Sequence, residues 1–134
     1  MHEHDRDGRA LAHLLAIVDR LRGRDGCPWD RKQTPETLKK YLLEETAELA
    51  EAIDSGDASH IREEIGDLFF ILAMLTAMFR EKDLFSAADA LNDIIEKMIR
   101  RHPHVFAGQA TGSERELRRQ WETIKAGEKQ TRNS

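Results

Sequence analysis

The sequence predicts an all-α fold, and three observations support that prediction. Apolar residues recur at the spacing of one helix face along most of the 134 residues. Charged residues make up 34% of the chain and aromatic residues only 6%, a balance typical of helical proteins. No convincing segment alternates apolar and polar residues as a half-buried strand would. We therefore expect about five helices in a single domain spanning 1–134, with its core at about 10–127.

The first two expected helices are separated by a loop. The first covers about 9–22, where apolar side chains recur at helical spacing: Leu11, Leu14, Leu15, Val18 and Leu21. It ends at Gly23, and residues 26–30 are predicted to form a loop because they contain glycine and proline. Thr34 followed by Pro35 predicts the N-cap and the first residue of the second helix.

The third expected helix, at about 58–80, is apolar on nearly every side beyond Asp67. The residues that leave it almost no polar face are Phe69, Phe70, Ile71, Met74 and Met78. In a small domain, such a helix needs more cover than its sibling helices provide. We therefore expect a helical bundle completed by homodimerisation, as a homodimer or a dimer of dimers.

The last two expected helices have recognisable ends. The fourth covers about 87–101 and ends before Pro103, because the residue preceding a proline disfavours helical geometry. The fifth begins where Ser113 and Glu116 have the spacing of a capping box. From about Gly127 the sequence is polar, and we expect a frayed tail there.

Charge, cysteine content and hydropathy exclude several classes of protein. The net charge is −4, and the sequence does not predict the basic face that a nucleic-acid-binding protein would need, so we expect no nucleic-acid partner. The single cysteine, Cys27, rules out an internal disulfide framework and fits a reducing compartment. The longest nearly unbroken apolar run, residues 68–79, is too short to span a membrane, and no secretory signal is visible. We expect a cytoplasmic protein without a membrane partner.

Two acidic pairs are the most informative feature of the chain. Glu45 with Glu48, and Glu64 with Asp67, are each spaced i, i+3, so both members lie on one side of a helix. The midpoint of the two pairs falls in residues 54–57, a turn-like run suited to joining antiparallel helices. Reversal there would bring all four carboxylates together. Glu45 also falls within the apolar stripe of its helix, where an unpaired carboxylate is costly.

Such a cluster repels itself unless a cation neutralises it. Hard divalent cations suit an all-oxygen site, so we predict a cation such as Mg²⁺ or Mn²⁺. The predicted metal ligands are Glu45, Glu48, Glu64 and Asp67. A solvated acidic helix face is the other interpretation. A di-iron carboxylate bundle is disfavoured because no Glu is followed three residues later by His.

Three basic residues and one aromatic residue are further candidates. Lys97, Arg100 and Arg101 end the fourth expected helix, where they either complement the helix dipole or hold the phosphates of a polyphosphate ligand. Trp29, in the predicted loop, either stacks on a base or sugar or caps the hydrophobic core. Residues 102–104 are interpreted as a structural turn.

Together these motifs resemble those of MazG-type nucleoside triphosphate pyrophosphohydrolases, in the all-α NTP pyrophosphatase superfamily. The resemblance covers about 10–127 and rests on residues 26–34, 44–48, 63–68 and 100–106, with Trp121, Glu122 and Lys125. It implies an all-α fold that dimerises, with Mg²⁺ at the four carboxylates. It also implies hydrolysis of a nucleoside triphosphate to a monophosphate and pyrophosphate.

The resemblance also suggests roles for individual residues. The expected catalytic residues are Glu44, Glu48 and Lys97, with Glu44 or Glu48 orienting the attacking water. The expected substrate-binding residues are Trp29, Lys97, Arg100 and Arg101. Two alternative functions remain open: a non-catalytic nucleotide-sensing or oligomerising module, and a phosphoribosyl-ATP pyrophosphohydrolase. The Cys-Pro-Trp-Asp sequence of the predicted loop argues against the latter.

Overall fold

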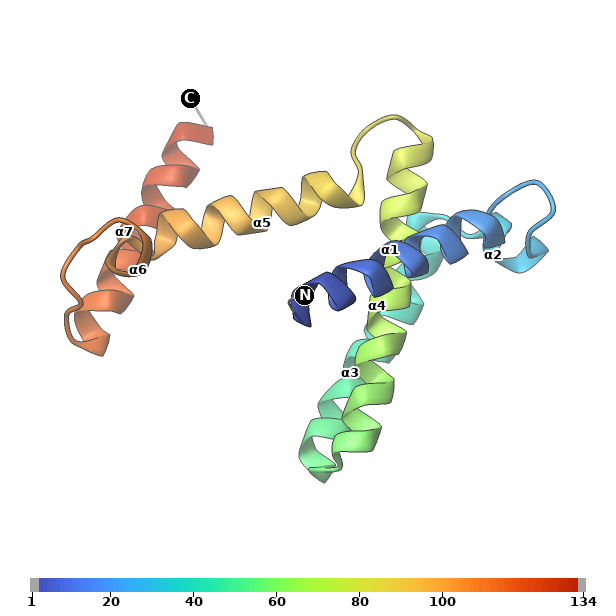
Figure 1. The fold of residues 1–134 in the computed structure, drawn as a ribbon, viewed down its shortest axis with the longest axis horizontal. Coiled ribbons are helices and arrows are strands. Elements are labelled where there is room, and N and C mark those ends of the chain that lie inside the picture. Colours follow the sequence, from blue (N-terminus) through green and yellow to red (C-terminus); the bar gives the residue numbers. More distant parts are fainter. Residues whose placement is uncertain (1–2, 133–134) are drawn as a thin grey trace. The chain divides into compact units, whose positions relative to one another are not determined.

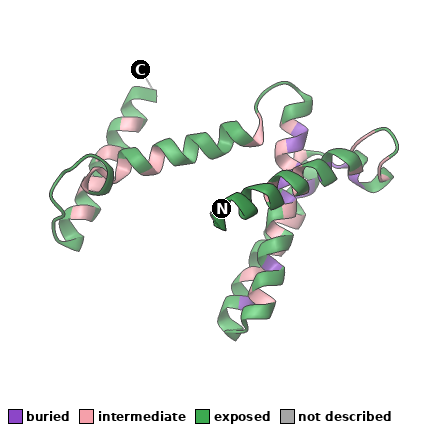
Figure 2. Ribbon diagram, viewed as in Figure 1, coloured by how far each residue is buried: buried purple, intermediate pink, exposed green. Residues whose placement is uncertain are grey.

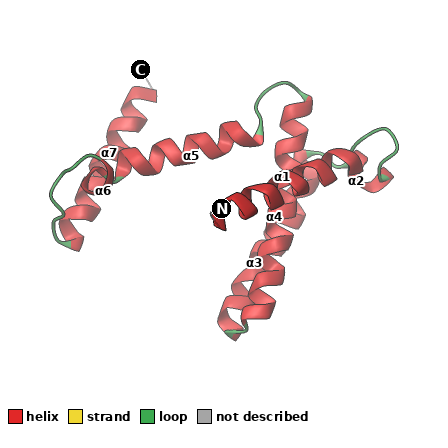
Figure 3. Ribbon diagram, viewed as in Figure 1, coloured by secondary structure: helices red, strands yellow, loops and turns green. Residues whose placement is uncertain are grey.

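A computed structural model describes residues 3–132 of the chain. Every regular element in this range is a helix, and there are seven of them (Figures 1 and 3). The all-α prediction is therefore confirmed. The chain divides after Ala87 into two compact units, which are treated separately below. Among the described residues, no helix combines the length and the hydrophobicity that crossing a membrane would require.

The expectation of about five helices is wrong because two short helices occupy segments that were predicted to be irregular. Helix α2 (Pro28–Lys32) replaces part of the expected loop at 26–30, and α6 (Pro103–Phe106) overlaps the expected turn at 102–104. Both begin with proline at the first helical position. Proline favours that position because its φ is already helical and its missing N–H has no helical partner there.

The first unit is built on three long helices, α1 (Glu3–Leu21), α3 (Pro35–Ser55) and α4 (Ala58–Glu81). Helix α3 begins after Thr34, which is its N-cap as predicted, and Thr34 and Thr37 form a capping box. The backbone N–H of Thr37 donates to Oγ1 of Thr34 at 3.2 Å, and the N–H of Thr34 donates to Oγ1 of Thr37 at 2.8 Å. These bonds satisfy N–H groups that a helix start leaves without partners.

The turn between α3 and α4 makes these helices antiparallel neighbours (Figure 1). Gly56 ends α3 in the left-handed region, with φ of 71°, which glycine adopts without a Cβ clash. Asp57 then caps α4, because its side chain accepts a hydrogen bond from the N–H of Ser59 at 2.9 Å. The predicted reversal at residues 54–57 is confirmed.

Helix α4 is the centre of the first unit's core, with α1 and α3 packed on it. Figure 2 shows buried positions along α4 and fewer of them on α1 and α3. The buried cluster consists of Val18, Leu38, Ile71, Ala73, Met74, Ala77 and Met78. Other apolar side chains of α4 remain open: Phe69 is 52% exposed and Leu72 46%. Within the described part of the first unit, the apolar segment of α4 beyond Asp67 is thus only partly covered.

Arg22 fastens α2 to the ends of the long helices. Its Nη1 donates to the backbone oxygen of Asp30 at 2.6 Å and to that of Gln33 at 3.2 Å. Its Nε pairs with the carboxylate of Glu81 at 2.7 Å. Gly26 is required before α2, because a Cβ there would overlap the carbonyl oxygens of the last two residues of α1. Hydrogen bonds from Arg22 and the close packing of Gly26 on the end of α1 therefore fix the position of the loop that leads to α2.

The second unit contains α5 (Ala87–Arg101), α6 and α7 (Glu114–Arg132). Helix α7 begins as predicted: the N–H of Glu116 donates to Oγ of Ser113 at 3.2 Å, within a capping box. The expected frayed tail from Gly127 is wrong, since α7 continues beyond it to Arg132. The physical reason is a set of contacts with α5 made near the end of α7, described in the next section.

Candidate metal centre

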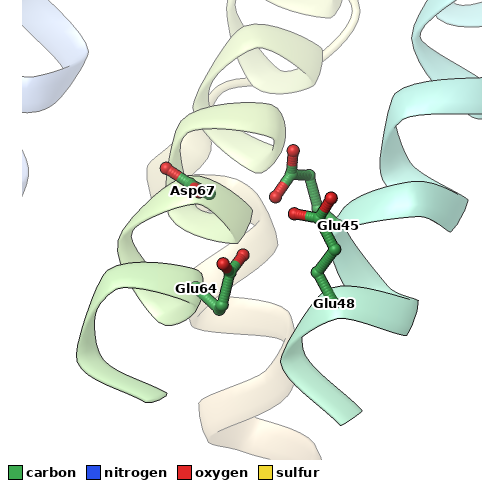
Figure 4. Close-up of side chains that lie close together, drawn as sticks. All are labelled: Glu45, Glu48, Glu64 and Asp67. Carbon is green, nitrogen blue, oxygen red and sulfur yellow. The ribbon is translucent and has the colours of Figure 1, made fainter. Parts of the chain in front are cut away.

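The hairpin of α3 and α4 gathers four carboxylates. Glu45 and Glu48 come from α3, and Glu64 and Asp67 come from α4 (Figure 4). One oxygen of each carboxylate lies within 4.8 Å of the corresponding oxygens of the other three. The i, i+3 spacing and the turn at Gly56 together bring these oxygens into a single group. The metal-ligand role of the four residues stays a prediction.

The cluster has a buried side and an open side. Glu64 is the deepest member at 7% exposure and Glu45 is half-buried, whereas Glu48 and Asp67 are exposed. In Figure 4, the side chains of Glu45, Glu48 and Glu64 extend into the space between the two helices. A cation could therefore reach the group from solvent and still meet partly desolvated oxygens.

Two carboxylate oxygens in this cluster lack partners. Among the described residues, the buried side-chain nitrogen and oxygen atoms without a hydrogen bond are Oε2 of Glu45 and Oε2 of Glu64. Buried polar atoms are rarely left in this state because desolvation costs free energy that no bond recovers. Both orphaned oxygens belong to one group of four acids. The donor set therefore fits a hard divalent cation.

The raised pKa values of the cluster reflect burial and charge repulsion, which a bound cation would reduce. The pKa of Glu45 is raised to about 7, chiefly by burial and then by the charges of Glu48 and Asp67. Burial and the same two charges also raise the pKa of Glu64. One nearby base partly offsets the repulsion, since Nε2 of His60 lies 3.4 Å from Oε1 of Glu64. Sequence reasoning missed His60, although its i, i+4 spacing from Glu64 was a usable signal.

The other candidate residues of the first unit lie outside the group of four. Glu44 is exposed on α3, adjacent in sequence to Glu45. Trp29 lies in α2 and is 46% exposed. Its ring meets that of Tyr41 edge-on, with centroids 5.5 Å apart. Trp29 is thus absent from the buried core and presents part of its indole to solvent.

The basic candidates Lys97, Arg100 and Arg101 lie in the last turns of α5, within the second unit. Both arginines pair with Glu128 of α7, a residue that sequence reasoning missed. The guanidinium of Arg101 also lies over the ring of Trp121, 4.9 Å from its centroid. Glu128 stands seven residues after Trp121, so helical spacing places both on one face of α7.

A helical hairpin that gathers four carboxylates defines the chain as an all-α protein with a candidate metal centre. Residues 33–106 match the MazG nucleotide pyrophosphohydrolase domain, and this range includes all four acids and the three basic residues of α5. The chain belongs to the MazG nucleotide pyrophosphohydrolase domain family.

Proteins with similar sequences support this assignment. A nucleoside triphosphate pyrophosphohydrolase/pyrophosphatase MazG of Thermotoga maritima is 43% identical over 127 residues, 95% of this chain and 48% of that protein. A nucleoside triphosphate pyrophosphohydrolase of Escherichia coli is 42% identical over 120 residues, 89% of this chain and 46% of its own length. The chain therefore spans about half the length of these two relatives.

A solved structure extends the similarity to the fold. The crystal structure of a mazG-related protein from Thermotoga maritima superposes with a TM-score of 0.71 and is 32% identical in sequence. The match covers 86% of this chain and 98% of that one. The similarity therefore extends beyond residues 33–106.

Proposed function

We propose that this chain hydrolyses nucleoside triphosphates to nucleoside monophosphate and pyrophosphate, and that it requires a divalent cation. The observation that carries the proposal is the pair of orphaned buried oxygens of Glu45 and Glu64 within a group of four carboxylates. The match of this segment to a nucleotide pyrophosphohydrolase family supports it. The names of the Thermotoga and Escherichia relatives suggest the same chemistry.

In this proposal, Glu45, Glu48, Glu64 and Asp67 hold the cation, which we take to be Mg²⁺, with Mn²⁺ as the alternative. A divalent cation supplies Lewis-acid chemistry, because it lowers the pKa of water and neutralises phosphate charge. The four acids must be ionised to bind it. The raised pKa of Glu45 therefore predicts weaker metal binding as the pH falls below about 7.

The remaining candidates act on water and substrate. Glu44 or Glu48 orients the attacking water and accepts its proton. The water oxygen bonds to the α-phosphorus, the bond from that phosphorus to the α–β bridging oxygen breaks, and pyrophosphate leaves with the electron pair. Lys97, with Arg100 or Arg101, stabilises the charge on the departing pyrophosphate. Trp29 binds the nucleoside by stacking on its base or sugar.

We also propose that residues 1–134 act as one MazG-type domain that works as a homodimer or a dimer of dimers in the cytoplasm. The exposed side chains of Phe69 and Leu72 support dimerisation, because a second copy would cover the open side of α4. Light scattering coupled to size-exclusion chromatography tests this expectation. A monomer at micromolar concentration would contradict it.

Substitution of single metal ligands tests the proposed activity. The variants are Glu64→Gln and Asp67→Asn, and the matched control is Glu51→Gln, an exposed acid on α3. Wild type and control are expected to convert triphosphate to monophosphate and pyrophosphate in ³¹P NMR with Mg²⁺. Each ligand variant should lose on the order of 100-fold in rate. Mg²⁺ should raise the melting temperature of wild type and control, but raise that of the ligand variants much less.

The same experiment separates the alternatives. Unchanged triphosphate in the presence of wild type and Mg²⁺ would contradict hydrolysis and favour a nucleotide-sensing module. Near wild-type rates in both ligand variants would contradict the metal assignment. Selective cleavage of phosphoribosyl-ATP in a competition assay would favour the related pyrophosphohydrolase.

A further inference from the structure

Glu128, in the last turns of α7, joins the two arginines at the end of α5. Its Oε2 accepts a hydrogen bond from Nε of Arg100 at 2.5 Å. Its Oε1 accepts from Nη2 of Arg101 at 2.9 Å and from Nε of Arg101 at 3.3 Å. One carboxylate therefore holds two guanidinium groups, with a separate oxygen for each.

The two arginines depend on Glu128 to different degrees. The side chain of Arg101 is only 11% exposed and that of Arg100 is 49% exposed. A guanidinium as buried as that of Arg101 needs a counter-charge, and the ring of Trp121 and the carboxylate of Glu128 both contact it. Hydrogen bonds from Arg100 and then Arg101 lower the pKa of Glu128 to about 2, so this carboxylate stays ionised at neutral pH.

The geometry leaves part of each guanidinium outside the ion pair. Glu128 contacts Nε of both arginines and one terminal nitrogen of Arg101. An arginine carries N–H donors on more than one edge, so the terminal donors of Arg100 and Nη1 of Arg101 are not used by Glu128. Two arginines paired with one carboxylate also keep a net positive charge, which the nearby Glu96 partly offsets. Both features suit the binding of a phosphate group.

We propose that Glu128 is a positioning residue, which holds Arg100 and Arg101 in the conformations that receive the phosphates of the substrate. This inference rests on the proposed function, in which these arginines bind the pyrophosphate part of a nucleoside triphosphate. Long arginine side chains lose rotamer freedom when they bind a ligand. Because Glu128 has already restricted them, less of that entropy remains to be lost on binding.

The test compares Glu128→Gln and Glu128→Ala with Glu114→Gln, an exposed acid at the start of the same helix. The Glu128→Gln side chain has almost the same size but no charge. We expect it to raise KM for the nucleoside triphosphate about tenfold, because charge-assisted bonds orient both arginines. The kcat should fall as well, because the proposed function assigns these arginines to the departing pyrophosphate, and the control should match wild type. Circular dichroism melting checks the fold, and Glu128→Gln carries the test if Glu128→Ala does not fold.

A background without Arg100 and Arg101 separates positioning from a purely structural role. If Glu128 acts through the arginines, Glu128→Gln should have no further effect on KM once both are replaced by alanine. An equal increase in KM in both backgrounds would overturn the proposal, because Glu128 would then act through the packing of α7.

Calorimetric binding of inorganic triphosphate distinguishes this proposal from the proposed hydrolysis. Binding about tenfold weaker for Glu128→Gln than for wild type supports positioning, even if wild type hydrolyses nothing. A wild type that hydrolyses triphosphates, with KM and triphosphate affinity unchanged in Glu128→Gln, overturns the positioning role and leaves the hydrolase standing. Wild type that binds no triphosphate overturns the positioning role as well.

Discussion

Glu45 on α3 and Glu128 on α7 are the same residue type, yet their pKa values move in opposite directions. Burial and neighbouring acids raise the pKa of Glu45 to about 7. Hydrogen bonds from Arg100 and Arg101 lower that of Glu128 to about 2. The first carboxylate meets like charges in its unit, and the second meets opposite charges in its own.

The difference indicates which cluster is complete. Around Glu128, each carboxylate oxygen accepts a hydrogen bond from an arginine, so the ion pair is satisfied by the protein alone. Around Glu45, four acids converge while two buried oxygens have no partner. A fold rarely keeps such a destabilising arrangement unless function requires it. The carboxylate cluster therefore has the composition of a candidate cation site, whereas the arginine pair does not need an additional charge to be stable.

Among the substitutions that test this contrast, Glu45→Gln should have the largest effect on activity. The substitution Glu45→Gln should reduce pyrophosphate release on the order of 100-fold, because it removes a charge from the proposed metal site. The same change should raise the melting temperature of metal-free protein by a few degrees, because it relieves repulsion among buried acids. Both effects are measured at pH 8, where Glu45 is mostly ionised.

The exposed acid Glu51 on α3 provides the control for this experiment. Glu51→Gln removes the same charge from the same helix, outside the group of four, and should alter neither rate nor melting temperature appreciably. A lower melting temperature for metal-free Glu45→Gln would show that repulsion does not dominate in the cluster.

The cluster of Glu128 with Arg100 and Arg101 should lose stability when a charge is removed, whereas the carboxylate cluster should gain it. Arg101→Ala is expected to lower the free energy of unfolding by about 2 kcal/mol, because it removes the more buried of the two arginines that pair with Glu128, and with it the contact with Trp121. Urea denaturation measures the change. Arg119→Ala, at an exposed position of α7, should stay within about 0.5 kcal/mol of wild type. Equal effects of the two substitutions would contradict the structural role of the pair.

The carboxylate cluster could be predicted from sequence because it depends on local information. Two i, i+3 pairs place the acids on helix faces, and Gly56 in the turn sets how the helices meet. Burial was harder to predict: Glu45 was placed within the apolar stripe, whereas Glu64 is the most buried of the four. The depth of a side chain depends on neighbouring helices, which periodicity along one helix does not specify.

The arginine pair could not be predicted from spacing along one helix. Glu128 is separated from Arg101 by 27 positions and from Arg100 by 28, and it lies in a segment whose polarity suggested a frayed tail. The spacing did not predict α2 and α6, because Pro28 and Pro103 were interpreted as loop or turn residues, unlike Pro35. Proline at a first helical position is equally consistent with a short helix.

The smallest expected effect is the pH dependence of the stability that Glu128 contributes through Arg100 and Arg101. A carboxylate whose pKa is lowered by folding stabilises the native state above its ordinary pKa, near 4.5, and loses that contribution as the pH falls through about 2. Wild type should therefore be more stable than Glu128→Gln by a constant amount above about pH 5, and by progressively less toward pH 2. Urea denaturation of both proteins across this range isolates Glu128 from the other acids, which are common to both. A difference that is unchanged down to about pH 2 would mean that Glu128 stabilises α7 through packing, and the contrast with Glu45 would no longer be electrostatic.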